Sequence, residues 1–232
     1  MFFRLMIKDI FFDLDRTLWD FEASSHETLL ELCISHNLSD KGIADYEAFI
    51  KNYKIHNDKL WELYRVDKIS QKDLRRERFQ RTLADYNIED VTLAEKIGED
   101  YVATCPKKNK LFPHTIEVLN YLSVKYKLHI ITNGFHEVQH IKLKHAGLSS
   151  YFDKIITSEQ VGVKKPNPKI FKYALQQANA EECIMIGDDL EVDVLGAEQM
   201  GIQGIFFNPN KTKHNTDIVH EIFCLSELKA LL

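Results

Sequence analysis

The sequence has no Cys-x-x-Cys pair, no repeat or low-complexity tract, and no apolar run near the length that crosses a membrane. Its four cysteines are scattered, which indicates free thiols in a reducing compartment and argues against a disulfide framework or a zinc knuckle. The segment from Met1 to Lys8 contains charged residues and lacks the apolar centre of a secretory signal. We therefore expect a soluble, cytoplasmic protein.

Positive charge is also scarce. The 30 Lys and Arg residues are outnumbered by 35 Asp and Glu, giving a formal net charge of −5. No basic stretch outweighs this balance, so a nucleic-acid polymer is not expected as a partner. Hydrophobic residues make up 44% of the chain, enough for the core of one large domain or two modest ones.

The short apolar run Ile10–Phe12 has the bulk and continuity of a strand that is buried on both faces. Two carboxylates, Asp13 and Asp15, follow it, and then the hydroxyl of Thr17. Such a strand places these residues at the carboxyl edge of a sheet, where open α/β folds bind their ligands. Two ionised carboxylates there repel each other unless a cation lies between them or one holds a proton.

From Phe21 to about Cys105 the apolar residues recur with the helical period, and no strand pattern is present. The pattern predicts four amphipathic helices in a bundle. Capping boxes that begin at Ser24, Ser70 and Thr92 are expected to open three of them.

After Pro106 the sequence alternates between strand and helix patterns. Strands are predicted at 128–131, 155–157, 183–186 and 204–207, helices at 136–146, 168–178 and 193–200, and a short strand with a closing helix from Glu221. This alternation predicts right-handed βαβ units around a parallel sheet. The opening strand finds partners only here, so we predict one α/β core, residues 1–18 and 106–232, interrupted by a helical domain at 19–105.

Polar clusters stand at the ends of these strands or at the start of the next helix. They are Asp13/Asp15/Thr17, Thr132/Asn133/Gly134, Lys164-Lys165-Pro166, and Gly187-Asp188-Asp189 with Asp193. Each cluster alone is also explained as a turn or a helix cap. Four of them in this order indicate a shared site.

The chemistry of these clusters is mutually consistent. Asp13 is a candidate nucleophile, and with Asp188 it offers the oxygen ligands that Mg²⁺ prefers. Thr132 and the backbone N–H groups after it can hold phosphoryl oxygens, and Lys165 can neutralise their charge. Asp15 can protonate a leaving oxygen and then deprotonate water. Phosphoryl transfer needs this kind of positioning and charge compensation.

These motifs resemble the four motifs of the haloacid dehalogenase superfamily. The longer phrases at residues 131–135 and 158–166 resemble its branch of pyrimidine-type 5′-nucleotidases. The resemblance implies a Rossmann-like α/β core with a helical C1 cap inserted after the first motif, and Mg²⁺ as cofactor. Arg16 departs from the small or acidic residue that the family often has at this position.

The resemblance also implies a role for each site residue. Asp13 would be the nucleophile and Asp15 the acid and base, with Lys165 as the third catalytic residue. Phosphate would be held by Thr132, Asn133, Gly134 and Lys165, and the metal by Asp13, the Asp15 carbonyl and Asp188, with Asp193 and Asp189 supporting the metal ligands.

Asp15 favours a phosphatase or a phosphomutase, because dehalogenases of the superfamily usually lack an acid at this position and the transport ATPases have threonine. We predict a Mg²⁺-dependent phosphatase of small phosphate monoesters, nucleoside 5′-monophosphates first, acting through an aspartyl-phosphate. A phosphoglycolate or sugar-phosphate phosphatase, or a sugar phosphomutase, remains an alternative. Trp19, Phe21 and Arg78 are the candidate substrate contacts, although Arg78 also fits a solvated helix face.

Two rival functions use different parts of the sequence. Residues 136–140 match the His-Glu-x-x-His pattern of zinc proteases, but no third zinc ligand is identifiable. Metal analysis tests this interpretation, because one equivalent of bound zinc would favour the protease. A phosphoacceptor signalling module also uses acids, Thr and Lys at strand ends, but it has no need of a long helical insert. Mg²⁺-dependent release of phosphate from a general ester would favour the enzyme.

Overall fold

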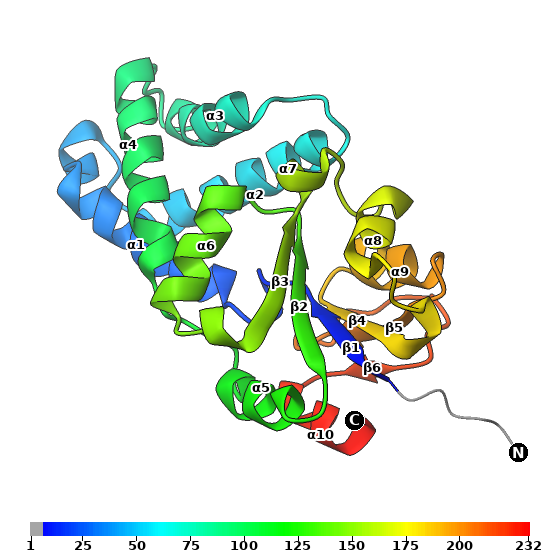
Figure 1. Cartoon of the computed structure of the whole chain (residues 1–232). Coiled ribbons are helices and arrows are strands. Elements are labelled where there is room, and N and C mark those ends of the chain that lie inside the picture. Colours follow the sequence, from blue (N-terminus) through cyan, green and yellow to red (C-terminus); the bar gives the residue numbers. More distant parts are fainter. Residues whose placement is uncertain (1–6) are drawn as a thin grey trace, which may run out of the picture. The chain divides into compact units, whose positions relative to one another are not determined.

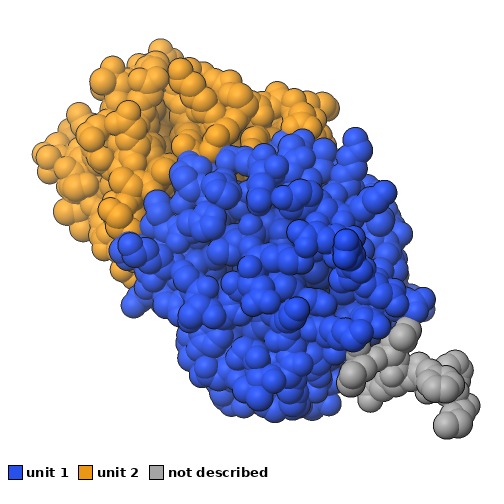
Figure 2. Space-filling view, viewed as in Figure 1, with its two compact units in different colours: residues 1–21, 109–232 blue, residues 22–108 orange. Residues whose placement is uncertain are grey.

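The computed structural model describes residues 7–232. The chain divides into two compact units, shown in different colours in Figure 2. Unit 1 comprises the chain up to Phe21 and again from Asn109 to Leu232, and unit 2 runs from Glu22 to Lys108. Unit 2 is therefore inserted into unit 1 just after the first strand and its loop.

Unit 1 contains a parallel sheet of six strands in the order β3-β2-β1-β4-β5-β6 (Figure 1). The strands are β1 (Asp9–Phe12), β2 (Lys127–Thr132), β3 (Phe152–Thr157), β4 (Cys183–Gly187), β5 (Gln203–Phe207) and β6 (Glu221–Ile222). All the predicted strands are present, and the α/β class with its inserted helical region is confirmed.

The first strand is central in the sheet and pairs with both β2 and β4. Its last residue, Phe12, lies opposite Ile130 of β2 and Ile186 of β4. Parallel strands in such register end at one edge, so the residues that follow β1, β2 and β4 come together there.

Helices cover both faces of this sheet, as Figure 1 shows, with α5 and α6 on one side and α8 and α9 on the other. The helices of unit 1 are α5 (Thr115–Ser123), α6 (His136–His145), α7 (Ser158–Val161), α8 (Pro168–Leu175), α9 (Gly196–Glu198) and α10 (Leu228–Leu231). Apolar side chains of α8 and α9 pack on one face of the sheet through Phe11, Ile131 and Met185. This packing holds the strand ends in fixed positions.

The helix predicted at 193–200 begins earlier than expected. A π-helical turn occupies Leu190–Leu195, before α9. Asp189 is its N-cap, since Asp189 Oδ1 accepts a hydrogen bond from the backbone N–H of Val192 at 3.1 Å. Asp193 therefore lies inside the first turn, and Gly187 leaves room for it: a Cβ added at Gly187 would be 2.2 Å from Asp193 Oδ2.

Unit 2 contains the four predicted helices, which are α1 (Phe21–Ser35), α2 (Tyr46–Arg65), α3 (Gln71–Ala84) and α4 (Val91–Thr104). Ser70 caps α3 as expected, because its side chain accepts from the N–H of Asp73. The other two expected caps are wrong. Asp90, not Thr92, caps α4 by accepting from Leu93, and Ser24 lies inside α1, which starts one turn earlier.

Short 3₁₀ turns connect several of these elements, at Leu38–Lys41, Cys105–Lys107, Ser149–Tyr151, Ala180–Glu182 and Leu225–Glu227. Within residues 7–232, every helix is too short or too polar to cross a membrane.

Candidate active site

The predicted site residues of unit 1 follow neighbouring strands. Asp13 comes directly after β1, Thr132 ends β2, and Asp188 comes directly after β4. These strands are adjacent in the order β2-β1-β4. The backbone N–H of Asp13 continues the pairing by donating to Ile186 O at 2.9 Å, so the loop leaves β1 in a defined direction.

Lys165 reaches this edge of the sheet from the loop that precedes α8, and only 2% of its surface is exposed. Its Nζ lies 2.6 Å from Asp13 Oδ1 and 2.6 Å from Asp193 Oδ1, and it donates to Ile131 O at 2.7 Å. An ammonium has three N–H donors, and three acceptors surround this one. The Lys165 ammonium is thus fixed between two carboxylates.

The side chain of Asn133 holds the backbone of Lys165. Its Nδ2 donates to Lys165 O at 3.0 Å, and its Oδ1 accepts from Lys165 N at 2.7 Å. Thr132 Oγ1 accepts from the N–H of Gly134 at 3.0 Å. The Asn133 amide thereby positions the Lys165 loop, and the phosphate contacts of these three motif residues stay a prediction.

Asp188 and Asp193 lie close to Asp13. Asp188 Oδ1 accepts from Thr17 Oγ1 at 3.1 Å, which joins the loops after β4 and β1. Asp193 Oδ2 accepts from the backbone N–H of Asp189 at 3.2 Å, while Lys165 holds its Oδ1. Both oxygens of Asp193 therefore have protein partners.

Burial dominates the electrostatics of this cluster. It raises the pKa of Asp13 well above its ordinary value, against the opposing charge of Lys165, and the neighbouring acids add to the rise. Burial, and then the charge of Asp193, raise the pKa of Asp188 to about 7. Burial likewise raises the pKa of Asp193, again opposed by Lys165. Burial acts to lower the pKa of Lys165, but Asp13 and Asp193 outweigh it and raise that pKa.

These three acids form a candidate metal site. Asp13, Asp188 and Asp193 each offer a carboxylate oxygen, and these atoms lie within 4.8 Å of one another. One ammonium opposes three carboxylates, so ionised acids leave an excess of buried negative charge that a divalent cation would offset. Hard oxygen donors suit Mg²⁺. The residues fit such an ion, with Asp13 and Asp188 better placed as ligands because Asp193 is already engaged.

Comparison with known proteins identifies the family of this chain. The family described as haloacid dehalogenase-like hydrolase matches residues 7–201 of the sequence. The chain belongs to this family. The hydrolase is 32% identical over 228 residues to "Pyrimidine 5′-nucleotidase YjjG" of Escherichia coli (strain K12), a match that covers 96% of each chain.

Two further relatives of the hydrolase widen this comparison. "Glyceraldehyde 3-phosphate phosphatase" of Methanothermobacter thermautotrophicus is 29% identical, with 98% of this chain and 100% of the relative covered. The crystal structure of YfnB from Bacillus subtilis, described as bound to magnesium, superimposes with a TM-score of 0.87 at 26% identity. That match covers 97% of this chain and 98% of YfnB.

The turn between Asp15 and Thr17 has an unusual backbone in this hydrolase. Arg16 has a φ of 66°, in the left-handed region that side chains larger than glycine rarely adopt. Its N–H donates to Trp19 O at 2.9 Å, and its guanidinium lies 5.0 Å from the centre of the Phe21 ring. The turn folds the chain back, and Arg16 stacks on Phe21 while Asp15 stays at the site.

Sequence reasoning missed two residues that contact Asp15 in the hydrolase. Gln139 Nε2 donates to Asp15 Oδ2 at 2.9 Å, and Lys142 Nζ lies 2.5 Å from Asp15 Oδ1. Both belong to α6, where the apolar pattern gave no sign that polar side chains point inward. The available signal was their i, i+3 spacing beside Val138 and Leu143, which are buried.

The three candidate substrate residues occupy different settings. Trp19 is 0% exposed, and its ring lies 4.4 Å from Lys142 Nζ, whereas Phe21 is half-buried. In unit 2, Arg78 is 3% exposed, and its Nη1 donates to Asn57 Oδ1 at 3.4 Å. The contacts of all three with a substrate stay a prediction.

The histidines of the zinc-protease pattern lie on the surface of α6. The rings of His136 and His140 are 4.7 Å apart, and His136 Nδ1 pairs with Thr157 Oγ1 at 3.0 Å. In the part of the chain that the structure describes, the group of Asp13, Asp188 and Asp193 is the one that could hold a metal through three side chains. The family match and this geometry favour a haloacid dehalogenase-like hydrolase over a zinc protease.

Proposed function

We propose that this protein is a Mg²⁺-dependent phosphatase that hydrolyses small phosphate monoesters, nucleoside 5′-monophosphates first, through an aspartyl-phosphate on Asp13. The observation that carries the proposal is the buried Lys165 ammonium, 2.6 Å from Asp13 and in contact with Asp193, beside Asp188. An anionic phosphoryl group next to Asp13 would need this compensating charge.

Two displacements at phosphorus make up the proposed reaction. An oxygen of Asp13 attacks phosphorus, the bond to the ester oxygen breaks, and the leaving oxygen keeps the electron pair and takes a proton from Asp15. Asp15 then takes a proton from water, whose oxygen attacks the phosphorus of the aspartyl-phosphate. The bond between phosphorus and the Asp13 oxygen breaks, which restores the Asp13 carboxylate and releases inorganic phosphate.

Other residues support these steps. When bound, Mg²⁺ would supply positive charge at the phosphoryl oxygens and offset the repulsion among the acids. The ion would be held by Asp13, the Asp15 carbonyl and Asp188. Asp193 and Asp189 would support these ligands without binding the ion directly. Thr132 and the backbone N–H groups after it would bind the phosphoryl oxygens, and Lys165 would neutralise charge there. Asn133 would contribute by fixing the loop of Lys165.

The substrate class rests on the relatives. YjjG is named as a pyrimidine 5′-nucleotidase, and its match runs over 96% of both chains, which supports a nucleoside 5′-monophosphate. The full-length likeness to a glyceraldehyde 3-phosphate phosphatase supports a second candidate, a phosphatase of small sugar phosphates. We assign the choice between esters to the insert at residues 19–105, since the motifs at the strand ends recognise the phosphate.

A panel of phosphate esters tests the proposal. Pyrimidine and purine nucleoside 5′-monophosphates, phosphoglycolate, glyceraldehyde 3-phosphate and p-nitrophenyl phosphate are assayed for phosphate release with Mg²⁺ and with a chelator. We expect Mg²⁺-dependent turnover with the highest kcat/KM for a nucleotide, and no turnover by a folded Asp13→Asn variant. Full activity of that variant would disprove the aspartyl-phosphate, and isomerised sugar phosphate without phosphate release would indicate a mutase.

A further inference from the structure

Both oxygens of the Asp15 carboxylate are held by one helix. Gln139 donates to Oδ2 at 2.9 Å and Lys142 lies 2.5 Å from Oδ1. The two residues are three positions apart on α6 and so share one face of the helix. The side chain of Asp15 keeps 26% of its surface exposed, so its partners fix it without enclosing it.

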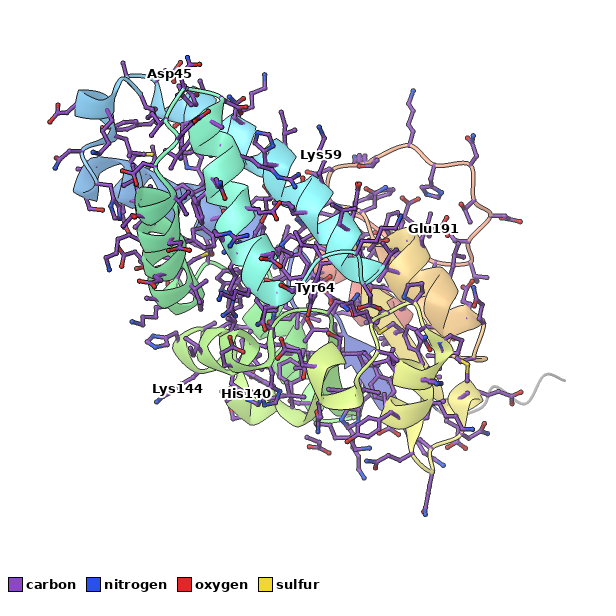
Figure 3. All side chains as sticks on the ribbon, turned by 90° about the horizontal axis from the view of Figure 1, so that it is seen from above. Asp45, Lys59, Tyr64, His140, Lys144 and Glu191 are labelled. Atoms are coloured by element: carbon purple, nitrogen blue, oxygen red, sulfur yellow. The ribbon has the colours of Figure 1, made fainter. Side chains whose placement is uncertain are left out.

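Burying these two side chains carries a cost that a merely structural helix face would avoid. Gln139 is 1% exposed and Lys142 is 5% exposed. An amide or an ammonium loses its water on burial, and an apolar residue would fill the same space at lower cost. By contrast, Lys144 and His140 on the same helix, labelled in Figure 3, are exposed.

The neighbouring motif glycine provides the space that Gln139 needs. A Cβ added at Gly134 would be 1.5 Å from Gln139 Nε2. Gly134 is not among the residues with positive φ, so its backbone does not require glycine. The absence of a side chain at 134 is therefore what lets the Gln139 amide reach Asp15.

Lys142 also contacts an aromatic ring. Its Nζ lies 4.4 Å from the centre of the Trp19 ring, an arrangement that attracts a cation to the ring face. Trp19 itself is fully buried, so the ring is a fixed platform. The Lys142 ammonium thus contacts both Trp19 and Asp15.

We propose that Gln139 and Lys142 are positioning residues that hold the Asp15 carboxylate in the orientation from which it transfers protons. This inference rests on the proposed phosphatase function. A carboxylate in a loop otherwise rotates about its side-chain bonds, and proton transfer needs it within hydrogen-bond reach of the reacting oxygen. Two donors on a packed helix remove that freedom.

The test separates the two steps with p-nitrophenyl phosphate in a rapid-mixing experiment. Its phenolate departs without a proton, so formation of the aspartyl-phosphate does not need Asp15, whereas hydrolysis of that intermediate does. Loss of positioning should therefore slow the second step alone. Phenolate is then released in a fast burst, followed by a slow steady phase.

Lys142→Met and Gln139→Met are the informative variants, because methionine keeps much of the volume without the donor. We expect the ratio of burst rate to steady rate to rise about tenfold or more over wild type, as expected for a displaced catalytic group. The Asp15→Asn variant, which lacks the acid and base, should show a change of the same sign. The ratio kcat/KM should stay within about twofold, because it reports binding and formation of the aspartyl-phosphate, whereas KM should fall together with kcat as the second step slows. Lys142→Arg, which keeps the charge and donors, should restore most of the steady rate.

Lys144→Ala is the matched control, an exposed lysine on the same helix, and its kinetics should equal those of wild type. Thermal unfolding of each variant shows that it is folded. Should Lys142→Met not fold, Gln139→Met and Lys142→Arg still give the ratio. The positioning role is overturned if the burst and steady rates of the Met variants fall equally. It is also overturned if their ratio is unchanged while Asp15→Asn shows the burst. Neither result contradicts the proposed phosphatase function. Wild-type protein without activity on any ester would overturn both.

Discussion

The two units each bury a cation, and they compensate its charge differently. In unit 1 the Lys165 ammonium lies between the carboxylates of Asp13 and Asp193. In unit 2 the Arg78 guanidinium lies over the rings of Tyr53, Phe79 and Tyr101, at 5.8, 5.3 and 4.5 Å from their centres.

This difference indicates which of the two buried side chains belongs to a cluster suited to binding a ligand. Around Lys165 the acids outnumber the cation, so their ionised forms leave an excess of negative charge that a second cation would offset. Around Arg78 the rings and the amide of Asn57 provide favourable contacts without any net negative charge. The first cluster is suited to chemistry, and the second stabilises a helical bundle. If Arg78 also contacts substrate, it does so in addition to this packing role.

Replacing Lys165 should have the largest effect. We expect Lys165→Met to lower kcat for p-nitrophenyl phosphate by about a thousandfold, because a charge that stabilises the transition state is lost. Two buried carboxylates also lose their partner, which lowers the free energy of unfolding by about 3 kcal/mol or more. Steady-state kinetics and urea unfolding measure both effects. Lys169→Met, at an exposed position, is the control, and equal activity of the two variants would contradict the prediction.

Arg78 separates packing from substrate contact. Arg78→Ala should lower the free energy of unfolding by about 2–4 kcal/mol, because it leaves a cavity among three rings. Arg78→Met fills much of that space and should recover most of the loss. If Arg78 also contacts the ester, as predicted, KM rises in the Met variant while its stability is recovered. Urea unfolding and saturation kinetics on a nucleotide give the two readouts, and an unchanged KM would leave packing as its role.

Mg²⁺ should stabilise unit 1 through its excess of acids. At a free Mg²⁺ concentration a hundredfold above its dissociation constant, linkage adds about 2.7 kcal/mol to the free energy of unfolding. Thermal unfolding with Mg²⁺ and with a chelator should show the shift in wild type. Asp188→Asn removes a predicted ligand and should abolish most of it. A shift of the same size in that variant would place the ion elsewhere.

His129 shows a third way to bury an ionisable group, and its effect should be the smallest. It lies in β2, with its Nε2 2.8 Å from Asp9 Oδ1, and burial lowers its pKa from the ordinary value of 6.5 despite that partner. The unfolded chain therefore binds a proton that the folded chain resists, so stability falls as the pH drops below about 6.5. His129→Gln should show a flatter loss of stability between pH 7 and pH 5 in urea unfolding. A slope equal to that of wild type would contradict the assignment.

Much of unit 1 could be predicted because its signals are local. Ile10–Phe12 is a continuous apolar run, and the polar residues directly after it had to emerge at the carboxyl edge of the sheet. The same reasoning anticipated that Thr132 and Asp188 would lie at the ends of other strands of the sheet. Lys165 could be grouped with them through its motif, but its contacts with Asp13 and Ile131 join residues 152 and 34 positions apart, and its contact with Asp193 is also a tertiary one.

What could not be predicted depends on tertiary contacts. Gln139 and Lys142 interrupt the buried face of α6, and helical periodicity alone treats such residues as exposed. Asp90 and Thr92 are both residue types that cap helices, and the sequence pattern does not tell which of them caps α4. The π-helical turn at Leu190–Leu195 and the close approach of Asp193 to Gly187 are likewise not encoded by any periodicity.

The close approach between Gly134 and Gln139 makes these two positions a unit for protein engineering. Any side chain larger than hydrogen at residue 134 alone would displace the Gln139 amide from Asp15, because the amide already fills that volume. A shorter residue at 139 together with alanine at 134 would relieve the overlap, but this pair would lose the hydrogen bond from Gln139 to Asp15. Redesign of the turn after β2 therefore begins with the helix that follows it.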